Sequence, residues 1–288
     1  MANSTFTRRD FAKAGIVLAA STQLQRADQA AVCRLAAEQE EGPFYIAGEL
    51  LRSDIVEGKP GVPLALRIVL LEASSCKPLA GAAVDLWHCD ALGLYSGFTK
   101  QNGMGPGPGM GPGMGRGPGG PPPPRDGMGM GGPPPDGPPP SRQTDKLTFL
   151  RGIQVSDANG VVNYQTVFPG FYMGRTNHIH FKVRIGDGKS FEAGHVSHTG
   201  QLFFPEELAV KLMAHEPYSK HKIHRTTQEE DHVYGDQHGE LSIARVAPLH
   251  GADLTAGMSA ELIATIDSKA TPARVGFGPG GPRFGGPR

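Results

Sequence analysis

The sequence predicts a mainly β fold: an antiparallel β-sandwich of about eight strands, with one or two short helices and a long disordered insertion rich in glycine and proline. Short apolar runs bounded by turn residues recur along the chain, a spacing typical of sandwiches. Residues 178–185 alternate strictly between polar and apolar side chains, which indicates a strand with one face in a core. The 41 glycines and 26 prolines concentrate in residues 103–140 and in the C-terminal tail, so the remainder has a β-rich globular composition.

The strands are expected in eight segments of the chain. These are residues 64–71, 82–88, 147–156, 161–168, 178–185, 201–204, 241–246 and 260–266. The sequence Asp157-Ala-Asn-Gly160 between two apolar runs predicts a hairpin turn. One helix is expected over residues 205–216, because proline suits a first helical turn and the two glutamates that follow suit the helix dipole.

The charge balance limits the classes of partner. The 288 residues include 28 basic and 28 acidic side chains, so the formal net charge is zero. No basic stripe or charged block is present, which argues against nucleic acid and anionic membranes as partners. Small molecules remain as the expected ligands.

The N-terminus predicts export. Arg8 and Arg9 are followed by Phe11, Lys13 and a short, weakly apolar run, a pattern typical of a twin-arginine signal. We therefore expect residues 1–31 to direct the protein to the periplasm or the extracellular space. The apolar run is far shorter than the ~20 residues of a spanning helix, so no stable membrane insertion is expected.

The rest of the chain is expected to form one domain. Residues 32–268 would form the sandwich, with residues 103–140 as a disordered loop between two strands and residues 269–288 as a disordered tail, because these segments have little to bury. The three cysteines, Cys33, Cys76 and Cys89, show no zinc-binding spacing. One disulfide is expected in an exported protein, and the sequence does not choose the pair.

The segment that carries the chemistry is 168–185. His178 and His180 share the polar face of the predicted strand with Cα atoms ~6.6 Å apart, so their imidazoles can converge on one metal ion. A phenol, Tyr172, and a guanidinium, Arg175, lie just upstream. This combination indicates a metal site for an anionic, oxygen-rich substrate.

Three segments together resemble a known family. They are residues 81–97, which run through Asp85-Leu-Trp-His-Cys-Asp90 to Leu94-Tyr-Ser-Gly97, residues 150–160, and residues 168–183. In this order they closely resemble the intradiol ring-cleavage dioxygenases, over about residues 33–267 without the insertion. The resemblance implies a non-haem ferric (Fe³⁺) enzyme that inserts both atoms of O2 into a catechol-type aromatic diol, giving a muconate-type dicarboxylate. Relatives form assemblies, so a homo-oligomer is compatible with it.

The resemblance also implies the metal ligands. Tyr95 matches the first phenolate of the family and Tyr172 the second, which leaves the metal when substrate binds. His178 and His180 match the histidine pair. A free tyrosine has a pKa of ~10, but a trivalent cation deprotonates a ligating phenol. Hard, anionic phenolates favour ferric over ferrous iron.

Three further residues are implied around the metal. Arg175 matches the arginine that stabilises charge on the bound substrate, as preorganised positive charge does. Gln201 lies where the family keeps a glutamine close to the iron site. Tyr45 lies in an arm that borders the pocket in relatives, and is expected to line the substrate site. Tyr172 would take the first substrate proton as it departs.

Other metal enzymes fit the residues less well. A cupin requires a glutamate shortly after its H-x-H pair, and none follows His180. A 2-His-1-carboxylate Fe(II) site would need Asp85 or Asp90 to reach the histidines, and a zinc hydrolase of the H-E-x-x-H type lacks its motif.

A different class is a catalytically inactive β-sandwich binding protein of the same fold. The insertion shortly after Tyr95 favours it, although a flexible insertion has a small energetic cost. The substrate stays open among catechol, protocatechuate, hydroxyquinol and alkylated or lignin-derived diols.

Overall fold

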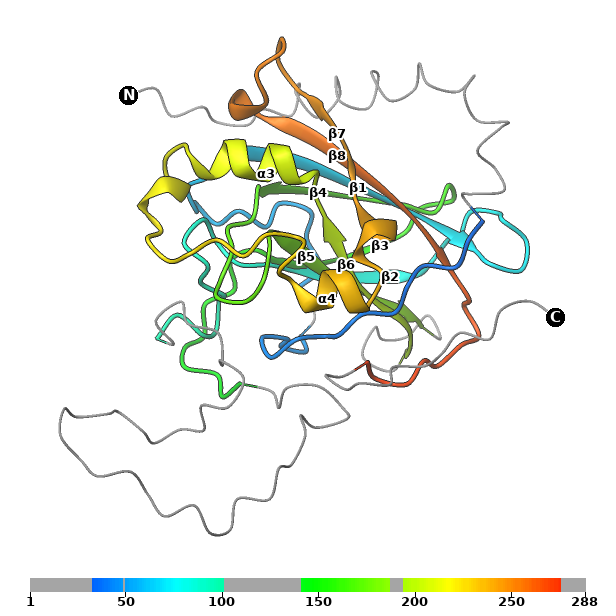
Figure 1. The fold of residues 1–288 in the computed structure, drawn as a ribbon. Coiled ribbons are helices and arrows are strands. Elements are labelled where there is room, and N and C mark those ends of the chain that lie inside the picture. Colours follow the sequence, from blue (N-terminus) through cyan, green and yellow to red (C-terminus); the bar gives the residue numbers. More distant parts are fainter. Residues whose placement is uncertain (1–32, 49, 101–140, 187–193, 276–288) are drawn as a thin grey trace.

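The fold is a sandwich of two four-stranded sheets (Figure 1). The computed structural model describes residues 33–48, 50–100, 141–186 and 194–275. The predicted signal, the glycine- and proline-rich insertion and most of the predicted tail lie outside the described residues. One sheet has the strand order β4-β1-β8-β7 and the other the order β3-β2-β5-β6.

The described chain has eight strands, in the order in which they were expected. The strands are β1 Pro63–Glu72, β2 Ala83–Trp87, β3 Arg151–Val155, β4 Val161–Val167, β5 His178–Ile185, β6 His195–Phe203, β7 Arg245–Pro248 and β8 Met258–Ile266. The α-helices of the described chain are α3 Glu206–Met213 and α4 His232–Asp236, and the 3₁₀ turns are η1 Tyr218–Lys220, η2 Gly239–Ser242 and η3 Leu254–Ala256. The predicted mainly β sandwich with one or two short helices is confirmed.

The pairing of strands differs from the expectation at one point. β1 runs parallel to β8, whereas the other pairings between named strands are antiparallel. The two strands lie at opposite ends of the domain in sequence, so a long connection through the second sheet brings them together in the same direction. A parallel pair needs such a crossover rather than a hairpin.

A continuous hydrophobic core fills the space between the sheets. It takes alternate residues from the strands, such as Leu64, Leu66, Ile68 and Leu70 of β1, each at most 1% exposed. Helix α3 adds Leu208, Ala209 and Leu212 to the same cluster. The core thus accounts for the alternation in the strands, and it leaves the polar side chains of β5 on the outer face of its sheet.

Three strands depart most from their predicted bounds. β3 begins at Arg151 rather than at residue 147. β6 begins at His195 rather than at residue 201, because residues 195–200, although mostly polar, continue the pairing with β5. The N-terminal arm bonds to part of this extension: the Gln39 N–H donates to the Thr199 carbonyl. Residues 241 and 242 lie in η2, and β7 begins only at Arg245. A short apolar run cannot distinguish a strand from a helical turn by periodicity alone.

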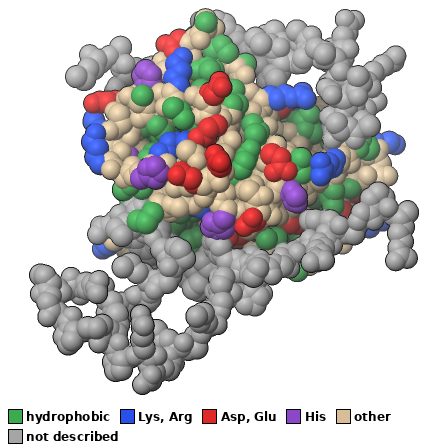
Figure 2. Space-filling model, viewed as in Figure 1, with side chains coloured by type: hydrophobic (Ala, Val, Ile, Leu, Met, Phe, Trp, Pro, Cys, Tyr) green, Lys and Arg blue, Asp and Glu red, His purple; other side chains and the backbone are tan. Residues whose placement is uncertain are grey.

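The N-terminal arm, described over residues 33–48 and 50–57, meets strands of both sheets: Leu35 bridges Thr265 of β8, the Gln39 N–H bonds to Thr199 of β6, and Asp54 bridges Gln165 of β4. A disulfide joins Cys33 to Cys76 and so ties the start of the arm to the loop after β1, whereas Cys89 is a buried free thiol. Figure 2 shows acidic and basic side chains interspersed over one face of the described chain. Among the described residues, no helix combines the length and apolar composition needed to cross a bilayer.

Candidate metal centre

Strand β5 places two imidazoles on the outer face of its sheet. His178 pairs with Phe203 of β6, and His180 lies between Trp87 of β2 and Gln201 of β6. Trp87 stacks on the His180 ring at an interplanar angle of 4°. Both histidines are 1% exposed. The alternation of β5 therefore places the two rings on the same buried face of the sheet.

The two imidazoles face each other through their Nε2 atoms, which lie 3.0 Å apart. The Nδ1 atom of His178 lies 2.6 Å from the carbonyl oxygen of Thr176, so this nitrogen donates and Nε2 keeps its lone pair. Burial lowers the pKa of His178 to about 3 and also lowers that of His180, so both rings are neutral. Two nitrogen ligands at right angles, each ~2.1 Å from one ion, are separated by ~3.0 Å, so the pair fits a metal ion.

Two phenols complete the group. The Tyr95 hydroxyl lies 3.4 Å from Nε2 of His178. The Tyr172 ring packs against the His178 ring at 5.7 Å and against the Tyr95 ring at 5.8 Å, both edge to face. Tyr95 is 2% and Tyr172 is 4% exposed. The structure therefore brings together all four predicted metal ligands from two stretches of the chain, the turn that holds Tyr95 and residues 172–180.

The donor set suits a hard, highly charged cation. Burial raises the pKa of both Tyr95 and Tyr172 above the usual value for a phenol, so each stays protonated unless a cation displaces its proton. No group of three or more His, Cys, Asp and Glu side chains in the described residues could hold a metal ion. Two neutral imidazoles with two phenols that become anionic on binding fit ferric iron better than a soft or weakly charged metal.

The carboxylates considered for an Fe(II) site are engaged elsewhere. Asp85 accepts a hydrogen bond of 2.9 Å from the Tyr45 hydroxyl, and Asp90 pairs with Lys59 at 2.6 Å. Neither has a contact with the histidine pair. This arrangement disfavours a two-histidine, one-carboxylate centre.

Arg175 lies beside the phenols with each guanidinium nitrogen engaged. Its Nε lies 3.1 Å from both carboxylate oxygens of Asp231, its Nη2 donates to Oε1 of Gln201, and its Nη1 lies 3.5 Å from the Tyr172 hydroxyl. The side chain is 4% exposed. Although burial disfavours the charged form, Asp231, Tyr172 and Glu40 raise the pKa of Arg175, so it keeps its positive charge next to Tyr172.

The N-terminal arm closes the site from outside. Nε2 of Gln201 donates to the carbonyl of Glu40 at 2.9 Å, and its backbone N–H donates to Oε1 of Gln39 at 2.6 Å. Gly42 passes directly over His180: a Cβ there would lie 3.1 Å from Cε1 of the ring, and its φ of 71° favours glycine. Phe44 then stacks on Tyr95 with ring centroids 4.6 Å apart.

The turn that carries Tyr95 is held by two buried or partly buried side chains. Arg151 donates to Oγ and to the carbonyl of Ser96, and also to the carbonyl of Phe44. Asp145 accepts hydrogen bonds of 2.9 Å from the backbone N–H groups of Gly97 and Thr99. These contacts position the first predicted phenolate independently of residues 101–140.

Tyr45 packs on Trp87 and Lys182 rather than on the candidate metal ligands. Its ring packs on Trp87 at 4.8 Å, the Lys182 ammonium lies 3.5 Å from the ring centroid, and its hydroxyl bonds to Asp85 and to Arg184. Its predicted role in lining the substrate site stays a prediction.

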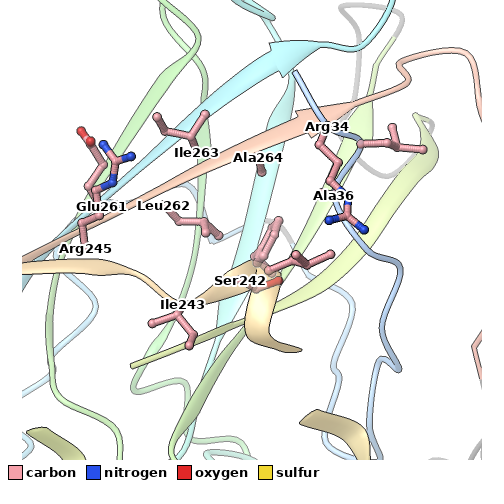
Figure 3. Close-up of a pocket in the computed structure, with 12 residues that line it drawn as sticks. Arg34, Ala36, Ser242, Ile243, Arg245, Glu261, Leu262, Ile263 and Ala264 are labelled. Carbon is pink, nitrogen blue, oxygen red and sulfur yellow. The ribbon is translucent and has the colours of Figure 1, made fainter. Parts of the chain in front are cut away.

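A cavity of about 220 Å³ lies elsewhere in the fold (Figure 3). It opens between the start of the arm, the segment from η2 to β7, and β8; Arg34, Ser242 and Leu262 are among its lining residues. None of the candidate metal ligands lines it.

Two site residues escaped the sequence reasoning. Asp231 holds Arg175 and also caps α4, accepting from the backbone N–H groups of Val233 and Tyr234. An aspartate before a helical turn is a recognisable signal, but a five-residue helix shows no periodicity to reveal it. Glu40 lies near Arg175 and had no signal beyond its place in the arm.

Comparisons with solved structures agree with this geometry. An intradiol ring-cleavage dioxygenase from Tetranychus urticae is 30% identical and covers 84% of this chain and 98% of its own, with a TM-score of 0.64. A second dioxygenase structure is 30% identical over 83% of this chain and 98% of its own, with a TM-score of 0.63.

More distant solved structures have lower identities and lower TM-scores. A catechol 1,2-dioxygenase from Pseudomonas arvilla C-1 is 19% identical over 94% of this chain and 77% of its own, and its TM-score of 0.47 is too low to carry an argument. No protein-family profile and no curated protein matches the chain.

Proposed function

The chain belongs to the intradiol ring-cleavage dioxygenase family, and from that premise we propose that it is an active, ferric-iron-dependent enzyme. It would insert both atoms of O2 into a catechol-type aromatic diol and release a muconate-type dicarboxylate. The observation that carries this proposal is the convergence of the His178 and His180 Nε2 atoms with the Tyr95 hydroxyl in a buried site beside Arg175.

The metal would be held by Tyr95, Tyr172, His178 and His180. When bound, ferric iron supplies a Lewis acid that binds the diol through its oxygens and makes its ring reactive towards O2. The hydrogen bond between His178 and the Thr176 carbonyl orients the first imidazole, and Trp87 holds the plane of the second by stacking.

Tyr172 is the ligand suited to leave. Its hydroxyl already lies within reach of Nη1 of Arg175, so the phenol has a partner when it is not on the metal. On departure its phenolate oxygen would accept a proton from one hydroxyl of the incoming diol. Tyr95 has a neighbouring imidazole instead and is clamped by the turn at Ser96, so it stays in place.

Arg175 supplies fixed positive charge where negative charge grows on the substrate. The carboxylate of Asp231 and the amide of Gln201 hold its guanidinium on two sides, which leaves Nη1 as the donor directed at the Tyr172 side of the site. Such donors need no reorganisation during the reaction, and removing one typically costs ~10²–10³ in rate.

Export is part of the proposal. The N-terminal sequence favours a twin-arginine signal, and the Cys33–Cys76 disulfide is typical of proteins that leave the cytosol. An exported enzyme would meet aromatic diols outside the cell. The partners would then be a small aromatic diol and O2, with neither nucleic acid nor membrane involved.

Turnover with labelled oxygen tests the function. Iron-loaded protein is incubated with a panel of catechols under ¹⁸O2, and the products are analysed by mass spectrometry. The proposal expects a dicarboxylate that carries two ¹⁸O atoms, from cleavage between the two hydroxyls. Iron-replete protein that binds catechols but consumes no O2 would instead support the inactive binding protein.

A further inference from the structure

Glu40 is a buried carboxyl in the arm over the site, and its backbone is fixed on both sides. Its N–H donates to Oε1 of Gln237 at 2.8 Å, and its carbonyl accepts from Nε2 of Gln201 at 2.9 Å. The residue is 2% exposed. The fold therefore fixes the backbone from which this carboxyl extends, and burial confines the side chain.

The two oxygens of this carboxyl differ in their surroundings. Oε1 lies 3.5 Å from Nη1 of Arg175, the same nitrogen that lies 3.5 Å from the Tyr172 hydroxyl. Oε2 is buried and has no hydrogen-bond partner. A buried acceptor without a partner is unfavourable, so a site that retains one usually receives a donor from a ligand or a water molecule.

The charged groups next to this carboxyl are Arg175 and Asp231. Asp231 already neutralises Arg175 through Nε, so Glu40 is a second carboxyl beside one guanidinium. Burial raises the pKa of Glu40 to about 7, although Arg175 opposes this effect. Ionised or protonated, the side chain keeps at least one oxygen that can accept a hydrogen bond.

Nη1 of Arg175, which lies 3.5 Å from the Tyr172 hydroxyl and 3.5 Å from Oε1 of Glu40, offers a donor, and Oε2 of the same carboxyl is an acceptor without a partner. A hydroxyl group matches this pair, because it can accept from the guanidinium and donate to the carboxyl. A ring carboxylate can only accept, and it would also face a second acidic group. A ring hydrogen or chlorine offers no donor to Oε2.

We propose that Glu40 contacts the substrate and selects catechols that carry a further ring hydroxyl over catechol itself and over carboxylated catechols. This inference rests on the proposed function and adds the substrate class that the same site prefers. The two hydroxyls of a bound catechol would lose their protons at the metal, so the hydrogen bond to Glu40 needs a third one.

Anaerobic binding measurements test the selection without turnover. Iron-loaded wild-type protein and the variants Glu40→Leu and Glu40→Gln are titrated with catechol, 1,2,4-trihydroxybenzene, pyrogallol and 3,4-dihydroxybenzoate. We expect the wild type to bind at least one trihydroxybenzene about tenfold more tightly than catechol, the effect of about one hydrogen bond. Glu40→Leu should abolish that preference, and Glu40→Gln, which keeps an acceptor oxygen, should retain part of it and bind 3,4-dihydroxybenzoate more tightly than the wild type does.

Glu38→Gln is the matched control on the same arm. Glu38 pairs with His198 and accepts from the Thr199 N–H, away from the metal ligands, so its variant should keep the wild-type preference. The proposal is overturned if the wild type prefers neither trihydroxybenzene over catechol. It is also overturned if Glu40→Leu keeps a preference within twofold of that of the wild type. An equal shift in Glu38→Gln also overturns it.

These measurements distinguish a failure of the proposed function from a failure of the proposed substrate selection. Wild-type protein that neither binds nor opens any diol would contradict both the proposed function and the role of Glu40. Wild-type protein that opens catechols with unchanged selectivity in Glu40→Leu would remove only the role of Glu40.

Discussion

The Nε atom of Arg175 lies 3.1 Å from both carboxylate oxygens of Asp231, and both side chains are buried. This pair holds the guanidinium in one orientation beside Tyr172. Asp231→Asn keeps an acceptor for the helix cap but removes the carboxylate that holds Nε of Arg175, and leaves only Glu40, at 3.5 Å from Nη1, beside the guanidinium. We expect kcat/KM for a catechol to fall about 10- to 100-fold with iron content retained.

Asp236→Asn is the control for this change, because Asp236 is exposed at the end of the same helix. It should keep wild-type kinetics. Equal kinetics in Asp231→Asn and wild type would contradict a positioning role for the carboxylate.

The two predicted phenolates should respond differently to removal of their hydroxyls. Tyr95→Phe should lose most of its iron, because the Tyr95 hydroxyl lies beside His178 in a turn held by Arg151 and Asp145. Tyr172→Phe should retain iron and slow substrate binding, since the leaving ligand is also the first proton acceptor. Iron content and stopped-flow binding measure the two effects. Complete loss of iron from Tyr172→Phe would contradict the leaving-ligand role.

Deletion of residues 103–140 should leave turnover largely intact. The chain on both sides of this segment is held together by Asp145, which bonds to Gly97 and Thr99, and by Thr144, whose N–H donates to the Gly97 carbonyl at 2.7 Å. The turn that carries Tyr95 is therefore closed without the insertion. Steady-state kinetics and iron content of the deletion variant measure this. A folded deletion variant that binds iron and has no activity would show that the insertion takes part in the reaction.

Asp145 should make the stability of this turn depend on pH. Although burial acts in the opposite direction, hydrogen bonds from Thr99, Leu147 and Gly97 lower the pKa of Asp145 to about 2. A carboxyl whose pKa is lowered in the folded state stabilises that state above its unfolded pKa of ~3.9, and this contribution is lost as the pH falls through 2.

Asp145→Ala should therefore reduce the free energy of unfolding by about 1 kcal/mol at pH 7, a value that allows for solvent screening of a partly exposed group. The difference from wild type should shrink between pH 4 and pH 2. Urea unfolding at a series of pH values measures it, and a difference independent of pH would contradict the hydrogen-bonded carboxylate.

The Cys33–Cys76 disulfide closes a loop with a sequence separation of 43 residues. In the chain-entropy account, such a loop stabilises the folded state by about 4 kcal/mol. Cys33→Ser and Cys76→Ser should each remove this stabilisation, and the double variant should lose no more than either single one. Denaturant unfolding with and without reductant tests this, and additive losses would mean that the two residues act separately.

The sequence predicted the site well where one short stretch carries both position and chemistry. The alternation in residues 178–185 predicted β5 and placed His178 and His180 on one face, and β5 spans those residues. The glycine turn around Tyr95 and the motif that contains Tyr172 came from the family resemblance. Their convergence on the histidines required the folded chain.

Contacts between distant segments could not be predicted in this way. The parallel pairing of β1 with β8 depends on the path of the whole chain, and neither strand signals it locally. The contacts of Arg175 with Asp231 and Glu40 cross 56 and 135 positions of sequence, and an isolated acidic residue is usually a solvated one. β6 was underestimated because most of residues 195–200 are polar, and only the folded chain shows that they continue the ladder with β5 and that the arm bonds to Thr199.

The visible spectrum of the purified, iron-loaded protein tests the central claim most directly. If Tyr95 and Tyr172 bind ferric iron as phenolates with His178 and His180, charge transfer from phenolate to iron should make the protein red-brown, and an added catechol should shift the band. A colourless preparation that contains one iron per chain would contradict phenolate ligation and with it the proposed function.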